Sequence, residues 1–424
     1  MGKRVVITGL GVCAPNGVGL DAFGTAMSEG KSGIRFIPQL QELGFGCQIA
    51  GEPQIDADLL RKYFTPLQLR GLNATGIIYG VIAGSDAWKN AGLTEALGET
   101  PDWDNGIIFG TGTLGVAKFR EAIHLVDGQK VRRLGSTTVI QTMASGISAY
   151  LGGMLGCGNQ VTTNSSACAT GTEGILMAYE RIASGKAKIM LAGSCSDSGP
   201  YVWAGFDAMR ILPRSLNDSP HTASRPMSAS AGGFVPGSGA GALVLESLES
   251  AQERGAKIYA EILGGAVNSG GQRGGGSMTA PNSEAVQRCI VEAVANSGIK
   301  KSDIDTINGH LTATAKDGLE IENWSRALGR SGQNFPYVNS FKSLFGHCLS
   351  AAGSIECVAA VLQFPMKRIF GNANCEDLHP EIAKRVTEDK IPLKTISHTP
   401  KILAKASFGF GDVNACLVFR RFTD

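Results

Sequence analysis

One of the ten cysteines of this 424-residue chain lies where an extended pattern changes into a helical one. The β-branched and polar run 161–166 precedes Cys168, and apolar residues recur at helical spacing from Ile175 onward. Cys168 is therefore expected in a first helical turn, where free N–H groups and the helix dipole favour an anion. Since a thiolate is an anion, this position predicts a lowered thiol pKa and a nucleophilic cysteine. Its small neighbours Ala167, Ala169 and Gly171 leave room for a substrate.

Three later stretches carry side chains that could act together with this nucleophile. They are Asn308-Gly-His310-Leu-Thr312-Ala-Thr314 with Asp317 and Glu320 behind it, Asn339-Ser-Phe-Lys342-Ser-Leu-Phe-Gly-His347, and Ser407-Phe408-Gly-Phe410-Gly-Asp412. These stretches contain two histidines, His310 and His347. Each follows a predicted strand and lies near hydroxyls or a lysine. Histidines without such context are expected to be structural; these are His124, His221, His379 and His398. The cysteine and histidine spacings are not those of a zinc site, so no metal is predicted.

The segment Ser166-Ala-Cys168-Ala-Thr-Gly171 resembles the nucleophile motif of the elongating β-ketoacyl-acyl-carrier-protein synthases. The resemblance extends over essentially the whole chain, from Val5-Val-Ile-Thr-Gly to Gly409-Phe-Gly, and includes His310-x-Thr312-x-Thr314 and Lys342-Ser-x-x-Gly-His347. It implies an α/β fold of the thiolase type, with two duplicated halves in five αβαβα layers and the site between them. Residues 1–255 would form the half with the cysteine, and residues 256–424 the half with the histidines and the lysine.

The resemblance also implies a role for each side chain. Cys168 would take the acyl group, His310 and His347 would donate hydrogen bonds as neutral imidazoles to an enolate, and Lys342 would pair with Glu320 beside Asp317. The N–H groups of Cys168 and Phe410 would bind an oxyanion, and Phe410 would be the gate. The remaining candidates are Thr279, Thr312, Thr314 and Phe408 for substrate binding, and Arg70 and Arg210 for a basic rim that meets an acidic carrier protein.

The reaction implied is a decarboxylative Claisen condensation of an acyl-enzyme with malonyl-acyl-carrier protein. Four departures from the family pattern leave the substrate open: Leu311 and Asp412 replace glycines, the loop before Asp317 is one residue short, and Ser238 stands at an acidic position. All but Ser238 lie in motifs that shape the mouth or gate of the site, so we expect these three to change substrate choice. Fatty-acid elongation is the main interpretation. The alternative is a type II polyketide or polyene ketosynthase, paired with a chain-length-factor-like subunit.

Other readings fit the residues less well. A biosynthetic thiolase needs a second cysteine in a C-terminal Cys-Gly motif, and the acetyl-primed initiating synthases have asparagine as the third partner where this chain has His347. A non-catalytic chain-length factor would lack the nucleophile.

Composition narrows the cellular setting. A net charge of +2 indicates no nucleic-acid or membrane partner, and ten scattered cysteines without a CxxC pair are typical of reduced thiols in a cytoplasm. No signal peptide and no bilayer-spanning stretch are expected. No cofactor is predicted, because phosphopantetheine would arrive on the carrier protein. By the resemblance, the enzyme is expected to be a homodimer.

The periodicity predicts alternating strands and helices. Strands are expected near 4–12, 107–110, 187–194, 240–247, 257–264, 305–310, 335–339 and 415–420, and helices near 66–91, 168–182, 284–297 and 349–358. Residues 199–236 and 401–407 are expected to be loops. The strand expected at 257 begins a second series of alternating strands and helices.

Overall fold

Two five-stranded half-sheets form the centre of the computed structural model, which describes residues 2–96 and 98–423. The first has the order β1-β8-β7-β5-β6, and the second has the order β9-β15-β14-β10-β11. The strands of the first are β1 (Val5–Ala14), β5 (Asn105–Thr111), β6 (Val161–Thr162), β7 (Ile189–Ser196) and β8 (Gly239–Ser247). Those of the second are β9 (Ala260–Ser269), β10 (Thr306–Asn308), β11 (Tyr337–Asn339), β14 (Ile402–Gly409) and β15 (Val413–Arg420).

The two half-sheets repeat one pairing scheme. In the first, β1 with β8 and β8 with β7 are antiparallel, whereas β7 with β5 and β5 with β6 are parallel. In the second, β9 with β15 and β15 with β14 are antiparallel, whereas β14 with β10 and β10 with β11 are parallel. A short antiparallel pairing of β1 with β9 joins them into one sheet. The fold is therefore a duplication.

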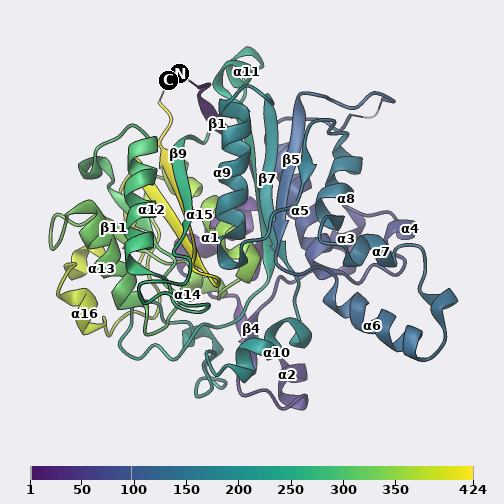
Figure 1. Cartoon of the computed structure of the whole chain (residues 1–424), viewed down its shortest axis with the longest axis horizontal. Helices are drawn as coiled ribbons and strands as arrows, with labels where there is room; N and C mark the ends of the chain where they lie inside the picture. The colour runs from purple at the N-terminus through teal and green to yellow at the C-terminus, as the bar shows by residue number, and fades with distance from the viewer. Residues whose placement is uncertain (1, 97, 424) are drawn as a thin grey trace.

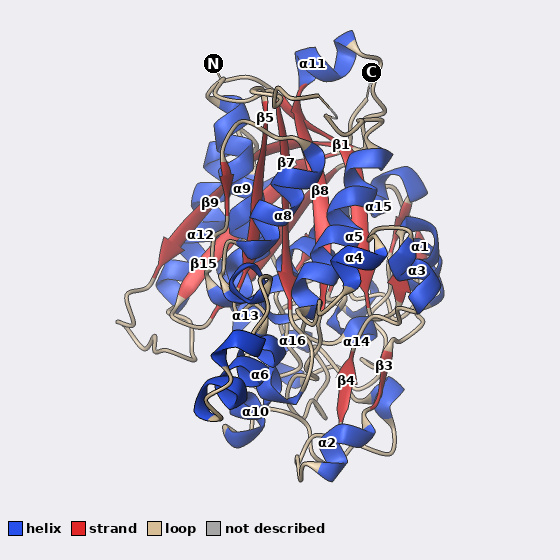
Figure 2. Cartoon of the chain, turned by 90° about the vertical axis from the view of Figure 1, so that its right-hand side faces the viewer, coloured by secondary structure: helices blue, strands red, loops and turns tan. Residues whose placement is uncertain are grey.

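Helices form three layers around the half-sheets (Figures 1 and 2). Between the half-sheets, α9 (Thr170–Ala183) and α15 (Ala352–Met366) pack on each other and on strands of both halves. Outside the first half-sheet lie α5 (Thr75–Asn90) and α8 (Gly146–Leu155), and outside the second lies α12 (Ser283–Asn296), which packs on α13 (Asp317–Leu328). This is the αβαβα layering that the resemblance implies.

Smaller elements surround this frame, and several reach beyond the ends of the long strands in Figure 2. The helices are α1 (Leu20–Glu29), α2 (Pro38–Glu42), α3 (Ala57–Arg61), α4 (Pro66–Leu69), α6 (Val116–Asp127), α7 (Thr138–Thr142), α10 (Pro200–Ala208), α11 (Leu248–Glu253), α14 (Lys342–Phe345) and α16 (Pro380–Ala383). The short strands are β2 (Gly17–Val18), β3 (Ile34–Phe36), β4 (Ile49–Gly51), β12 (Arg368–Ile369) and β13 (Ile396–Ser397).

Three local expectations are wrong. Residues 402–409 form the buried strand β14 rather than a loop, because they pair on both sides, with β10 and with β15. The helix expected over 66–91 is split into α4 and α5, with Gly71 at a φ of 77° between them. The expected loop 199–236 contains α10, which has Pro200 in its first turn.

The segment Leu349–Met366 is long and apolar enough to cross a membrane by length and composition. Of this segment, 83% is buried inside the protein. Its helix α15 lies between the two half-sheets (Figure 1). A helix that is apolar on most of its surface is stable when protein encloses it, so this segment is a core helix.

Candidate active site

Cys168 lies in a tight turn that leads into α9. It is the middle residue of a 3-10 helix, Ala167–Ala169, and Ala167 has a φ of 49°, in the left-handed region. Small residues permit the close packing behind this turn. A Cβ atom on Gly171 would come within 2.4 Å of the Ser354 nitrogen on α15. The crossing of the two central helices therefore fixes the position of the cysteine.

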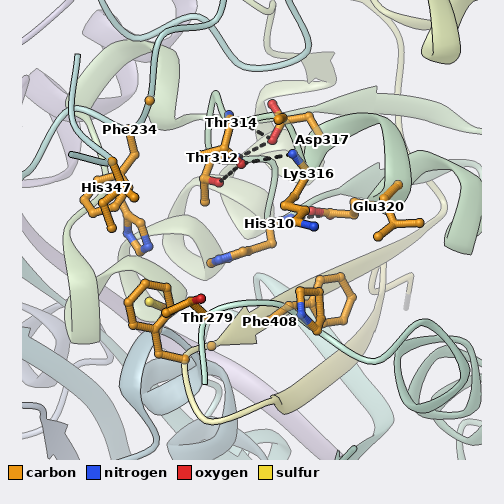
Figure 3. Close-up of a pocket in the computed structure, with 18 of the residues that line it drawn as sticks. Phe234, Thr279, His310, Thr312, Thr314, Lys316, Asp317, Glu320, His347 and Phe408 are labelled. Atoms are coloured by element: carbon orange, nitrogen blue, oxygen red, sulfur yellow. Dashed lines mark hydrogen bonds between the residues drawn. The ribbon is translucent and has the colours of Figure 1, made fainter. Parts of the chain in front are cut away.

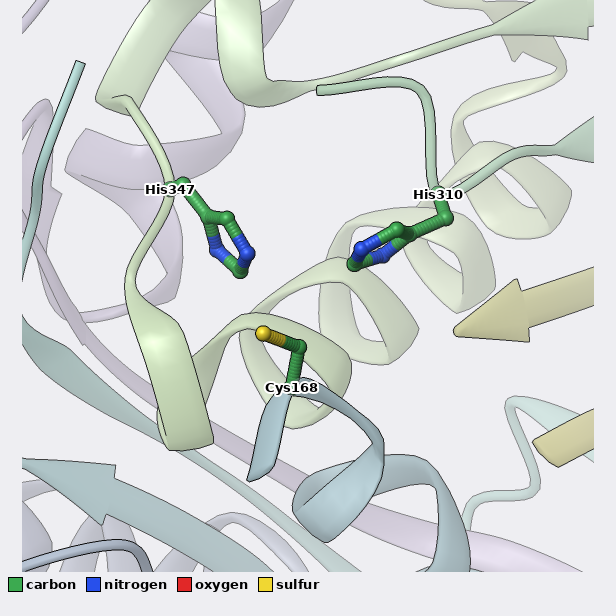
Figure 4. Close-up of side chains that lie close together, drawn as sticks. All are labelled: Cys168, His310 and His347. Atoms are coloured by element: carbon green, nitrogen blue, oxygen red, sulfur yellow. The ribbon is translucent and has the colours of Figure 1, made fainter. Parts of the chain in front are cut away.

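Two histidines from the second half face the sulfur of Cys168 (Figure 4). His310 follows β10, and His347 follows the short helix α14. The Sγ of Cys168 and a ring nitrogen of each histidine all lie within 4.8 Å of one another. The two ring centroids are 5.4 Å apart. The structure thus brings together three residues that are far apart in the sequence and come from both halves.

These three side chains are also of the types that bind zinc, and their ligand atoms are close enough to share one ion. An ion there would occupy the sulfur lone pair on which covalent chemistry by the cysteine depends.

Both imidazoles are buried and held in the neutral form. The pKa of His310 lies well below its usual value because of burial, then because of the charges of Lys342, His347 and Lys405. Burial, Lys342 and Lys405 lower the pKa of His347 in the same way. The backbone N–H of Leu349 donates to Nδ1 of His347 over 3.2 Å, so the proton of this neutral ring is on Nε2. His347 can therefore donate a hydrogen bond from Nε2 into the site.

The prediction of a lowered cysteine pKa is wrong. Burial raises the pKa of Cys168 to about 11, against the opposing effects of the Lys342 charge and the Phe410 N–H. The thiol is partly exposed to the cavity, but protein atoms surround it closely enough for desolvation of the thiolate to dominate. The resting residue is a thiol, and the sulfur must lose its proton as it attacks.

Lys342 does not pair with Glu320, contrary to expectation. Its Nζ donates to the His310 carbonyl over 2.6 Å and to Oε1 of Glu356 on α15. Glu356 is also in an ion pair with Lys405 on β14, at 2.8 Å. All three ionic side chains are fully buried. Sequence analysis missed Glu356 and Lys405, although a lone glutamate in an apolar helix was a signal.

Glu320 instead holds the backbone at His310. Its two carboxylate oxygens accept the N–H groups of His310 and Leu311, over 2.6 and 2.7 Å. Burial raises the pKa of Glu320 to about 7, although the Leu311 N–H opposes that rise. The reason for the correction is local: α13 begins at Asp317, so its first turn points Glu320 at the chain that leaves β10.

Asp317 organises the threonine loop in a similar way. Its carboxylate accepts the N–H groups of Thr312 at 2.9 Å and Ala313 at 3.1 Å, and that of Met227 at 2.8 Å from another segment. Ala313 has a φ of 62°, so the loop is tightly turned. Thr312 and Thr314 share a hydroxyl contact of 3.2 Å. The short loop before Asp317 therefore still presents both hydroxyls.

A cavity of about 500 Å³ leads to the cysteine and the histidines. In Figure 3, Thr279 lies on the side opposite Thr312 and Thr314. Of the predicted residues, the lining includes Cys168, His310, His347, Thr279, Thr312, Thr314, Asp317, Glu320, Phe408, Phe410 and Arg210. Lys342 is not part of the lining, because it lies behind His310, and neither is Arg70, an exposed residue that ends α4.

Sequence analysis missed the aromatic wall of this cavity. Phe206 and Phe234 come from the region expected to be a loop, and their ring centroids are 5.5 Å apart. Phe234 lies 5.1 Å from the His347 ring, and Phe206 lies 6.2 Å from the Phe410 ring. Aromatic side chains spread over an irregular segment have no periodicity that would reveal them.

The two glycine replacements have different consequences. Leu311, at a φ of 25°, is fully buried in the core of the second half and is not part of the cavity lining, so the expectation that it shapes the mouth is wrong. Asp412, at a φ of 63°, accepts the N–H groups of Gln272 at 3.0 Å and Asn282 at 2.8 Å. Asp412 therefore ties the Phe410 loop to the segment that carries Thr279.

Family models match both halves of the chain. Residues 2–251 match the β-ketoacyl synthase N-terminal domain, and residues 259–376 match the C-terminal domain. The chain belongs to the β-ketoacyl synthase family, and it is an acyltransferase of the ketosynthase class with a thiolase-type α/β fold.

Similar proteins extend over the whole chain. The 3-oxoacyl-[acyl-carrier-protein] synthase 1 of Haemophilus influenzae is 32% identical over 427 residues, which cover 99% of this chain and 99% of that protein. The 3-oxoacyl-[acyl-carrier-protein] synthase 2 of Vibrio harveyi is 32% identical, and the match covers 100% of this chain and 99% of that protein. A β-ketoacyl synthase structure from Burkholderia phymatum has a TM-score of 0.89 at 27% identity, covering 99% of this chain and 100% of that chain.

Two polyketide-type structures are also similar. One is a ketosynthase bound to a hexaketide in complex with its type II acyl-carrier protein, with a TM-score of 0.87 at 28% identity. The other is the ishigamide ketosynthase/chain length factor, with a TM-score of 0.87 at 27% identity. Each covers 100% of this chain and is covered completely by it.

Proposed function

We propose that this protein condenses an acyl group on Cys168 with malonyl-acyl-carrier protein to give 3-oxoacyl-acyl-carrier protein, in fatty-acid elongation. The observation that carries the proposal is the placement of two neutral, buried histidines over one partly exposed cysteine at the end of an apolar cavity. Curated relatives with the printed name 3-oxoacyl-acyl-carrier-protein synthase support the substrate.

The residues divide the reaction between them. Cys168 attacks the acyl thioester and loses its proton, the carrier thiol leaves, and an acyl-enzyme remains. Malonyl thioester then loses carbon dioxide, and hydrogen bonds from His310 and His347 stabilise the enolate oxygen. The enolate carbon attacks the acyl carbonyl, and the N–H groups of Cys168 and Phe410 hold the oxyanion until the cysteine sulfur leaves.

The cavity wall offers a path for the phosphopantetheine arm. Thr279, Thr312 and Thr314 are the hydroxyls that would hold it, with Phe408 beside them and Phe410 as the gate. Arg210 at the cavity supports a basic rim for the carrier protein, whereas Arg70 has no such support. We further propose that the chain consists of two units that meet near residue 255. We also propose that the protein is a homodimer and that it is soluble in the cytoplasm.

Intact-mass analysis tests the function. The wild-type protein is incubated with acyl-carrier proteins that bear saturated chains of graded length, and Cys168→Ala is the matched control. We expect one acyl adduct on the wild type, none on the variant, and a 3-oxoacyl product after malonyl-carrier is added. A wild-type protein that takes no acyl group from any of these carriers would contradict the proposal.

A second candidate is a ketosynthase of a specialised type II polyketide or polyene pathway. The similarity to the two polyketide-type structures favours it, and so does the Asp412 contact between the two mouth segments. In that case a chain-length-factor-like subunit would be the partner. Conjugated and β-keto acyl-carriers offered in parallel with saturated ones decide between the two, because only one group should be elongated well by the protein alone.

A further inference from the structure

The second half of the molecule buries a charged cluster at positions where the first half has none. The strands β7 and β14 have equal length and the same place in their half-sheets, and their sixth residues, Ser194 and Ser407, make equivalent contacts. Ser194 shares a hydroxyl contact of 2.7 Å with Ser354, and Ser407 shares one of 2.8 Å with Thr172. These contacts align the two halves residue by residue.

The alignment places Lys405 opposite an alanine. Lys405 is the fourth residue of β14, and Ala192 is the fourth residue of β7. Glu356 is the fifth residue of α15, and Gly174 is the fifth residue of α9. The same frame is thus built in the first half without an ion pair at these two positions, so the fold itself does not require Lys405 and Glu356.

The cluster contains two lysines and one glutamate. Glu356 faces Lys342 with Oε1 and Lys405 with Oε2, and Lys405 also donates to the Ala406 carbonyl and, at 3.1 Å, to the Ser407 hydroxyl. Two cations against one carboxylate leave a net positive charge in a fully buried place. Burying such a charge is costly, and an apolar replacement is often neutral or stabilising. A function is therefore a better explanation for the cluster than stability.

We propose that Lys405 is a positioning residue of the condensation site: it keeps Glu356 aligned with Lys342 and gives the cluster its net positive charge behind the two histidines. The inference rests on the proposed function, because a positive field there favours the negative charge of an enolate. Lys342 transmits the alignment directly, since it bonds both Glu356 and the His310 carbonyl.

The same charge keeps the imidazoles neutral. Lys405 contributes to the low pKa of both His310 and His347, after burial and Lys342. The charged and titratable groups around the two rings include Lys342, Lys405, Glu356, Glu320, Asp317 and Cys168, and Lys316 and Arg210 line the same cavity. Of these, Lys405 does not touch the cavity, so its removal changes the field without changing the contacts of the substrate.

Histidine titration by NMR in the resting protein tests the inference without relying on activity. The protein is labelled at its six histidines, and His310→Ala and His347→Ala identify the two signals. In Lys405→Met we expect both signals to titrate at higher pH than in the wild type. In Lys405→Met/Glu356→Gln the cluster again has one net positive charge, so we expect both histidine signals to titrate close to the wild-type pH. Unchanged titration in folded Lys405→Met overturns the inference.

Activity provides the second readout. We expect Lys405→Met to lower malonyl decarboxylation about tenfold, less than the loss of a direct oxyanion donor because Lys405 acts from behind the histidines, and to shift the acidic limb of its pH profile upward. Ser407→Ala, which removes a neutral contact of Lys405, should leave that limb in place. If Lys405→Met does not fold, Lys405→Gln is measured in the same way. A wild type without decarboxylation contradicts the proposed function, whereas the titration result decides the inference separately.

Discussion

The two halves of this protein build the same tight turn and use it differently. In the first half, Ala167 at a φ of 49° opens the turn into α9, and in the second half Leu349 at a φ of 50° opens the turn into α15. The next residue is Cys168 in one half and Ser350 in the other. Cys168 lines the cavity, whereas Ser350 is buried and donates to the Cys195 carbonyl over 2.8 Å.

The difference shows how a duplicated frame acquires a single active centre. The first half offers a nucleophile at its turn, and the second half offers His347 just before its own turn, with His310 from the end of β10. The helices cross where Gly171 and Gly353 approach each other. Each half is therefore incomplete without the other, and one centre forms at their contact.

The largest effect is expected from exchanging the two equivalent turn residues for alanine. Cys168→Ala should abolish condensation, because Cys168 is the only cysteine among the residues described along the cavity and its sulfur is the atom that the two histidines face. Ser350→Ala should retain it and lose about 1 kcal/mol of unfolding free energy with its hydrogen bond. The measurements are product formation and denaturant unfolding. Condensation by purified Cys168→Ala would contradict the assignment of the nucleophile.

His310→Ala and His347→Ala should separate the two half-reactions. We expect malonyl decarboxylation to fall about 10²–10⁴-fold, whereas acylation of Cys168 continues, because the enolate forms only in the second step. Release of carbon dioxide measures one half-reaction, and intact mass measures the other. Near wild-type decarboxylation by either variant would remove that histidine from the proposed role.

The cluster behind His310 should give an intermediate effect. Lys342→Ala removes the donor to the His310 carbonyl, and we expect a loss of about 10–100-fold in decarboxylation, similar to the loss of a group that orients a catalytic residue. Glu320→Gln should loosen the His310 and Leu311 backbone through a lost acceptor. Retained full activity in Lys342→Ala would show that the contact does not position the histidine.

The pKa shifts of Cys168 in the first half and of the two histidines in the second half predict how alkylation and decarboxylation depend on pH. Since the pKa of Cys168 is raised to about 11, its alkylation by iodoacetamide should speed up about tenfold per pH unit from pH 7 to 10, as the thiolate fraction grows. Peptide mapping distinguishes it from partly exposed Cys157, whose pKa is raised to about 12. Since the pKa values of the histidines lie well below 6.5, neither histidine should contribute an inflection at pH 6.5 to the decarboxylation profile.

The smallest effect is expected at the mouth of the site. Asp412→Asn keeps one acceptor oxygen and loses the other, so it should weaken one of the two contacts to the segment 272–282. We expect KM for the acyl-carrier substrate to rise several-fold with little change in kcat. Asp412→Gly restores the family residue and should alter the chain-length preference. An unchanged KM and preference in both variants would exclude a role in substrate choice.

The motifs around the cysteine and the histidines identified residues that the fold brings together, because each motif is a short segment that carries its own turn or strand end. The periodicity also predicted most central strands and the α/β class. The strand 402–409 was missed, since Lys405 and Ser407 make it look polar while their partners come from α15 and α9. A pattern along one segment does not show which buried groups it will meet.

The sequence by itself determined which residues could react: a cysteine before a helix, two histidines after strands, and hydroxyls beside them. Only the tertiary structure decided their partners and protonation. Lys342 meets Glu356 instead of Glu320, because Lys342 reaches from α14 to the side of His310 that faces α15, whereas the Glu320 carboxylate is occupied by the His310 and Leu311 N–H groups. The thiol pKa rises rather than falls, because desolvation depends on every atom that packs around the sulfur, and those atoms come from both halves.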